Sequence, residues 1–295
     1  MKKMKVSRPK NSETNSDEIH LHTKQPHVLL AYRKKFGSRI IVNQIAAISK
    51  VTFHELIREK ILWSSMAFGI LAVILSIVVT QLSYTDNARI ALDFGMTSIA
   101  IIGGIISIMM GSALVTKELQ NRTHFIVLTK PVFRWQFIIG RWLGLFEVLV
   151  LNSTIMCFMM LLIFWQLGGV FTWELFQCLL LLIVEFGVLA SVASIFSTFT
   201  TTTLASIITA GIWLVGHAME EVKIVSRKME QPWLQNTFTY VTEALPDLTR
   251  FDIKMQVSHM LPISDAMVLS SVAYGLAYMG FALIIACFIF SKKEL

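Results

Sequence analysis

The sequence is poor in charged residues. Only 15 % of its 295 residues are charged, while 55 % are hydrophobic. A soluble domain usually carries about a quarter of its residues as Asp, Glu, Lys and Arg. Repeated apolar runs of membrane length stand in their place, and such runs indicate a polytopic helical membrane protein. This composition disfavours an ordinary soluble domain and favours an all-α chain folded within a bilayer.

Cysteine is scarce, and motifs of catalysis are missing. Cys157, Cys178 and Cys287 all lie inside apolar runs, where a free Cys behaves as a small hydrophobe. We therefore predict no disulfide framework and no metal site. The sequence has no phosphate-cradling GxxxxGK[ST] loop and no nucleophile elbow. We expect the chain to be non-catalytic by itself and to bind no cofactor directly.

Six transmembrane helices are predicted from the apolar runs. A helix of about 20 residues crosses a hydrocarbon core of about 30 Å. The spans are residues 61–82, 94–115, 143–165, 175–199, 202–219 and 266–290. Together, residues 61–295 form the predicted transmembrane domain.

Two segments precede the first span. Residues 1–37 are polar and lack an apolar period, which is typical of a flexible cytosolic tail. Residues 38–60 have apolar residues on one helical face and Lys50, His54 and Arg58 on another. This pattern predicts an amphipathic helix in the membrane interface. The alternative is an ordinary surface helix of a small soluble domain.

The basic residues predict the orientation. Residues 1–60 hold thirteen Lys or Arg against five Asp or Glu, and residues 117–141 hold five against one. Residues 220–265 hold five basic and seven acidic residues. Because Lys and Arg accumulate in cytoplasmic loops, both termini are expected in the cytoplasm. The net charge of +7 thus lies mostly beside spans, which argues against a nucleic-acid partner.

The predicted external segment, residues 220–264, is not wholly polar. It carries many apolar residues and is punctuated by Pro232, Pro246 and Pro262. Short re-entrant or interfacial helices before the last span would bury these apolar side chains and keep the carboxylates in water.

Ionisable residues within or beside the spans mark a possible pathway. Glu147 and Glu185 lie in the third and fourth apolar runs, and His217 lies near the end of the fifth. Such residues normally face the bundle interior or a cavity. One interpretation is a substrate or proton route. The other is hydrogen-bonded packing, with Glu147 close enough to the interface to reach it.

The cytoplasmic loop 117–134 is longer and more basic than a plain connection requires. It has a short apolar stretch, residues 124–128, between its charged flanks. This combination favours a segment that docks against a partner, although the positive-inside rule alone also explains its charge.

The residues around this loop resemble a family. They are similar to the ABC transporter permeases of the type-two exporter class, and most similar to the permease of the nitrous-oxide-reductase maturation exporter. The resemblance rests on Gly111 to Glu118, Arg122-Thr123, Leu128, Pro131, Arg134 and Gly140 to Gly144, with further matches at Leu245 to Leu248, Phe251-Asp252 and Ser291 to Lys293.

The resemblance implies a function and a set of partners. The chain would be the membrane-spanning subunit of an ATP-driven exporter in a bacterial inner membrane, with membrane lipid around it. Two permease copies, identical or different, would work with two separate ATPase subunits that use ATP and Mg. In the family, the loop after the second span is a coupling helix that docks on the ATPase. The positions carried over to that role are Glu118, Arg122, Thr123, Phe125, Leu128, Pro131 and Arg134.

Two rival functions remain open from the residues. A proton-coupled carrier or channel would use Glu147, Glu185 and His217. A non-transporting membrane scaffold would use the 117–134 loop to recruit a cytosolic partner.

Overall fold

The structure, a computed structural model, describes most of the chain as helices. It describes residues 37–60, 87–121, 133–227, 245–259 and 261–292, with isolated positions between 63 and 78 and at 233, 240 and 242. Helices and connecting turns account for these residues, and no strand occurs among them. The longer helices are α3 (Gly37–Ile57), α5 (Asn87–Asn121), α7 (Arg134–Gln166), α8 (Trp173–Ser197), α9 (Thr202–His217), α10 (Met219–Arg227) and α13 (Asp265–Lys292).

Residues Gln44–Leu295 form one compact unit, and the contacts described below lie within it. Helix α8 is its most buried long helix, with 17 of 25 residues inside, whereas α13 buries only seven of 28. A helix that is apolar on every side belongs in a core. Accordingly, α8 packs against α5, α7, α9 and α13.

Small residues bring α5 and α8 close together. A Cβ atom added to Gly111 would lie 2.9 Å from the Cβ of Ala193 and 3.0 Å from the carbonyl oxygen of Ala190. A Cβ atom on Gly103 would lie 2.2 Å from the ring of Phe186. In a bilayer, helices associate mainly through such packing, because lipid tails are as apolar as their side chains.

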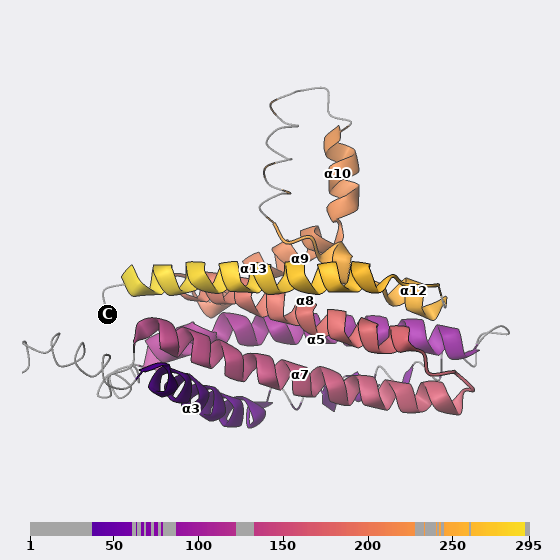
Figure 1. Cartoon of the computed structure of the whole chain (residues 1–295), viewed down its shortest axis with the longest axis horizontal. Helices are drawn as coiled ribbons and strands as arrows, with labels where there is room; N and C mark the ends of the chain where they lie inside the picture. The colour runs from indigo at the N-terminus through magenta and orange to yellow at the C-terminus, as the bar shows by residue number, and fades with distance from the viewer. Residues whose placement is uncertain are drawn as a thin grey trace, which may run out of the picture. The chain divides into compact units, whose positions relative to one another are not determined.

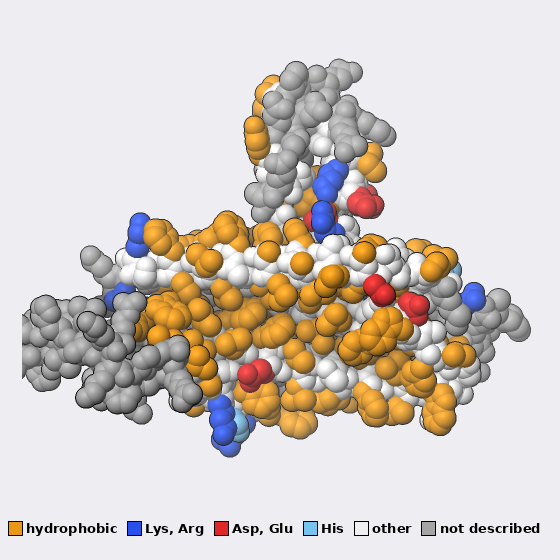
Figure 2. All heavy atoms as spheres, viewed as in Figure 1, with side chains coloured by type: hydrophobic (Ala, Val, Ile, Leu, Met, Phe, Trp, Pro, Cys, Tyr) orange, Lys and Arg blue, Asp and Glu red, His pale blue; other side chains and the backbone are white. Residues whose placement is uncertain are grey.

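Four helices are long and apolar enough to cross a membrane among the described residues. They are residues 88–116, 134–166, 173–197 and 265–292. A fifth span is possible if the bent pair α9 and α10 counts as one. These correspond to the predicted second, third, fourth, sixth and fifth spans. The predicted first span, residues 61–82, lies mostly outside the described positions. Figure 2 shows apolar side chains over much of the bundle surface, as contact with lipid requires.

The helix boundaries differ from prediction mainly at α7. Its apolar run was expected from residue 143, but the helix starts at Arg134. The additional turns contain Gln136 and Ile138, both fully buried, and Gly140, which faces α3. Tertiary packing thus makes these nine residues helical, although their sequence includes charged and polar side chains.

The fifth span is short and interrupted. Helix α9 has 16 residues, or about 24 Å at the usual rise per residue. At Ala218 the chain turns by 71° into α10, which leaves the direction of the bundle (Figure 1). Two further short elements, η1 (Leu248–Phe251) and α12 (Lys254–Ser258), precede α13. Short helices therefore do occur in the described part of the predicted external segment.

Candidate functional site

The predicted coupling segment, residues 117–134, connects α5 to α7. Helix α5 continues to Asn121, five residues beyond the end of its apolar span at Thr116. Glu118 therefore lies in the last turns of α5, and Arg134 is the first residue of α7. The other predicted coupling residues lie outside the described part: Arg122, Thr123, Phe125, Leu128 and Pro131.

On the α5 side, the residue that precedes the segment contacts α9. The hydroxyl oxygens of Thr116 and Thr202 lie 2.8 Å apart, one near the end of the α5 span and the other at the start of α9. Thr116 also donates to the carbonyl oxygen of Ser112 at 2.8 Å. A movement of this end of α5 would therefore act directly on the first turn of α9.

On the α7 side, the segment is fastened to α13. The Nη1 atom of Arg134 donates to the carbonyl oxygen of Ser291 at 3.2 Å. The first turn of α7 is also capped, because the backbone N–H of Phe133 donates to Oε1 of Gln136 at 3.0 Å. The two sides of the segment thus make their first contacts with different helices.

Helix α3, from Gln44 onward, lies against the first turns of α7. A Cβ atom on Gly144 would lie 2.6 Å from the carbonyl oxygen of Ser49, and one on Gly140 would lie 2.8 Å from the Cβ of Ile48. Gly140 and Gly144 therefore allow the two helices to touch. The sequence predicted close approach at this glycine pair but did not identify the partner helix.

Polar contacts complete the junction between α3 and α7. Arg141 donates through Nη1 to Oε2 of Glu55 at 2.9 Å. Ser49 donates to Oε1 of Glu147 at 3.0 Å. Glu147, predicted as a possible pathway residue, thus lies on the α3 side of α7. The structure does not bring it together with Glu185 and His217.

Glu185 and His217 do meet. The Oε1 atom of Glu185 lies 2.9 Å from Nε2 of His217 and accepts a hydrogen bond from Nε1 of Trp213 at 3.3 Å. Glu185 has no solvent exposure. Its second oxygen, Oε2, has no hydrogen-bond partner among the described residues. A charged side chain in a bilayer costs roughly 2.5–3.5 kcal/mol on insertion scales, so a buried carboxyl group such as Glu185 is a candidate functional residue.

Trp213 was missed by the sequence reasoning. It lies one turn before His217 on α9, with the two rings edge to face at a centroid distance of 5.9 Å. A Cβ atom on Gly104 would lie 2.9 Å from the Trp213 ring, so this glycine on α5 makes room for the indole. The spacing of four residues from His217 was the signal available in the sequence.

The break between α9 and α10 lies beside this cluster. Ala218 follows His217 directly and donates its N–H to the carbonyl oxygens of Leu214 and Val215. Gly216 packs against η1, where an added Cβ would lie 2.8 Å from a side-chain methyl of Leu248. Irregular backbone within a membrane is tolerated where protein covers it or where it lines a cavity.

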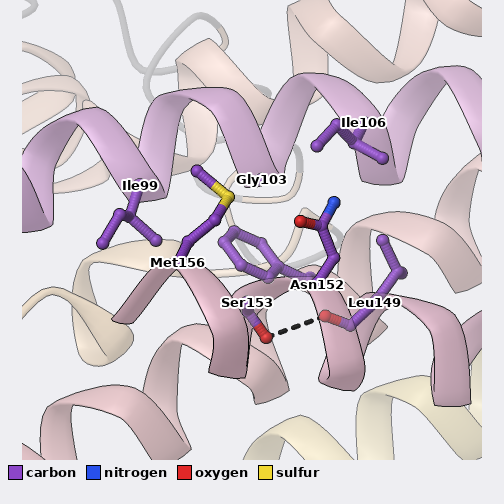
Figure 3. A pocket seen from close by; sticks show the side chains of 8 residues that line it. Ile99, Gly103, Ile106, Leu149, Asn152, Ser153 and Met156 are labelled. Atoms are coloured by element: carbon purple, nitrogen blue, oxygen red, sulfur yellow. Dashed lines mark hydrogen bonds between the residues drawn. The ribbon is translucent and has the colours of Figure 1, made fainter. Parts of the chain in front are cut away.

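A narrow cavity lies between α5, α7 and α8 (Figure 3). Ile99, Gly103 and Met156 line it together with Asn152, whose amide points toward α5. The Oδ1 atom of Asn152 has no hydrogen-bond partner among the described residues. Ser153 also lines the cavity, but its hydroxyl donates to the carbonyl oxygen of Leu149, and the surface that the cavity presents is apolar.

A charged cluster joins the elements on the α10 side of the bundle. Asp247 lies 2.9 Å from Lys223 of α10 and 3.7 Å from Arg250, and it accepts a hydrogen bond from Thr249 at 2.5 Å. Tyr274 of α13 accepts from the Asp247 N–H at 3.0 Å. Burial raises the pKa of Asp247, but the hydrogen bonds from Thr249 and Lys223 and the charges of Lys223 and Arg250 outweigh burial. The net pKa therefore lies below its ordinary value of 3.8.

These observations define a class: a multi-pass helical membrane protein, with apolar helices joined by a basic loop and an interrupted fifth span. The sequence profile of the ABC-2 family transporter proteins matches residues 45–295. The chain belongs to the ABC-2 transporter family, and it is thus the permease component of an ABC transporter. Members of this family are membrane components that work with an ABC ATPase subunit. A comparison with curated proteins found no match.

Proposed function

We propose that this permease couples ATP hydrolysis by separate ATPase subunits to the export of a cargo. The observation that supports this most is the family match over residues 45–295, together with the basic segment 117–134 between α5 and α7. Two permease copies would pair with two ATPase subunits, which bind ATP and Mg. We propose further that the chain is related to the permease of the nitrous-oxide-reductase maturation exporter, on the motifs around segment 117–134.

The contacts on either side of the segment suggest how coupling works. A docked ATPase would push on residues 117–134, including Glu118 and Arg134. The α5 side would pass the movement to α9 through Thr116 and Thr202. The α7 side would pass it to α13 through Ser291 and to α3 through Arg141. A small displacement would thereby shift two sets of helices relative to one another.

The proposed setting is a bacterial inner membrane with both termini in the cytoplasm. The excess of Lys and Arg in residues 1–60 and 117–141 supports this orientation. Helix α3 would lie in the cytoplasmic interface, with lipid on its exposed face. Val42 and Val51 are largely exposed on that helix, as burial in lipid headgroups requires.

Co-purification tests this function. The tagged protein would be purified in detergent from its native cells, as wild type and as a Glu118→Arg/Leu128→Asp double variant. We expect a stoichiometric ATPase subunit with vanadate-sensitive activity in the wild type, and its loss in the double variant. Glu174→Arg, a charge reversal in the first turn of α8, is the matched control and should retain the ATPase. A wild-type preparation without ATPase would contradict the proposal.

A proton-coupled carrier is the second candidate, and the buried Glu185–His217 pair favours it. It predicts transport without an associated ATPase, driven by a proton gradient. The purified permease, reconstituted into vesicles without an ATPase, separates the two functions. A carrier of this kind would transport in these vesicles, whereas an ABC permease would not.

A further inference from the structure

We infer that Glu185, Trp213 and His217 form a binding site for a cationic group, such as an ammonium or another organic cation. The site lies at the break between α9 and α10. If the proposed export function holds, the site also indicates the chemical class of the cargo, and this part of the inference rests on that function. The binding itself can be measured on the permease alone.

The carboxylate of Glu185 has a partner on only one of its two oxygens in the described part of the chain. Glu185 uses only Oε1 for Trp213 and His217, while Oε2 has no hydrogen-bond partner among the described residues. Buried polar atoms in proteins are nearly always satisfied, so such an atom in a functional protein points to a missing partner. The side chain is completely buried, which excludes bulk water as that partner.

The surroundings of this oxygen determine the charge of the ligand that it would bind. A carboxylate oxygen accepts hydrogen bonds and attracts positive charge. The α9 helix also ends at His217, and the last turn of a helix carries partial negative charge. Both features favour a cation and disfavour an anion.

A ligand would reach Glu185 from the side of His217. The side chain of His217 is 27 % exposed, so it forms the open side of an otherwise buried cluster. Leu214 and Val215, which precede it on α9, are exposed as well. Interrupted helices in transporters place backbone ends and polar side chains at binding sites in the same way. A cation would approach past His217 and displace its ring from Glu185.

The test uses benzylammonium as a probe, because it carries both a positive charge and N–H donors for the free oxygen. Binding of the labelled cation to the purified full-length chain in detergent would be measured by equilibrium dialysis for the wild type, Glu185→Gln and Glu174→Gln. Gln keeps an acceptor for Trp213 but cannot be charged. We expect Glu185→Gln to bind at least tenfold more weakly and Glu174→Gln to match the wild type. Benzoate, an anion of similar size assayed separately, should not bind at this site.

Absent saturable binding by the wild type, or equal binding by Glu185→Gln, would overturn the inference. Because Glu185 is remote from segment 117–134 in sequence, Glu185→Gln should still co-purify with the ATPase. Lost cation binding with a retained ATPase therefore leaves the proposed function standing.

Discussion

Charged side chains hold the two sides of the bundle together in different ways. Where α3 meets α7, Arg141 pairs with Glu55 beside a glycine pair that puts the two backbones in contact. On the α10 side, Asp247 is contacted by Lys223 and Arg250, whose side chains are 43 % and 52 % exposed. Each junction has a half-exposed charged partner, since Glu55 is 42 % exposed, but the first also combines its ion pair with backbone contact at the glycine pair. We therefore expect α3 to be held to α7 more firmly than α10 is held to the bundle.

The largest effect is expected from Gly144→Ala. The new Cβ would lie 2.6 Å from the Ser49 carbonyl oxygen and 2.7 Å from the Thr52 Cβ, so α3 must move away. Overpacking of this kind costs about 1–3 kcal/mol. Thermal unfolding in detergent should show a lower melting temperature.

Gly280→Ala is the matched control for this substitution. An added Cβ on Gly280, within α13, meets no atom within 4 Å. Its stability should be unchanged or raised by up to about 1 kcal/mol, since Ala is the better helix former. Equal melting temperatures for the two variants would show that α3 does not pack closely against Gly144 of α7.

A smaller effect is expected from the Arg141–Glu55 pair. Arg141 has only 9 % side-chain exposure, but Glu55 has 42 %, so solvent screens the pair. Glu55→Gln should therefore cost about 1 kcal/mol or less. The double variant Glu55→Gln/Arg141→Gln should lose less than the sum of the two single variants, as expected for residues in contact. Strict additivity in the melting data would mean that the pair does not interact.

The smallest effect is expected at Asp247, and it depends on pH. Because its pKa is lowered in the folded protein, its contribution is fully present above its ordinary value of 3.8 and is lost as pH falls through the lowered pKa. The exposed partners limit this contribution to about 1 kcal/mol or less. Melting curves in detergent from about pH 3 to about pH 7 should show a steeper acid loss for the wild type than for Asp247→Asn. Parallel curves would contradict this assignment.

The sequence predicted the helices well where apolar runs are long. The predicted spans 175–199 and 266–290 agree with α8 and α13 to within about two residues. This success has a simple cause, because lipid requires a continuous apolar helix. The start of α7 was missed by nine residues, since the contacts with α3 and α13 that fold Arg134 to Trp142 are distant in sequence.

The candidate site was predicted only in part. Sequence reasoning nominated Glu147, Glu185 and His217 together, because each is an ionisable group within or beside an apolar run. The structure groups Glu185 with His217 and places Glu147 beside Ser49 of α3. Periodicity within one helix gives no information about which helix lies opposite, so this separation could not be foreseen. The predicted coupling role of residues 117–134 stays a prediction.

The most direct test of the account measures distances in the complex with its ATPase. Spin labels at Trp135 and Ser291 would report on the contact between α7 and α13, and labels at Trp135 and Thr203 would report on the separation of α7 from α9. Cys157, Cys178 and Cys287 would first be replaced by Ala. With ATP and vanadate, we predict a changed distance between residues 135 and 203 and an unchanged distance between residues 135 and 291. Distances that all stay constant, or that change equally, would contradict coupling through segment 117–134.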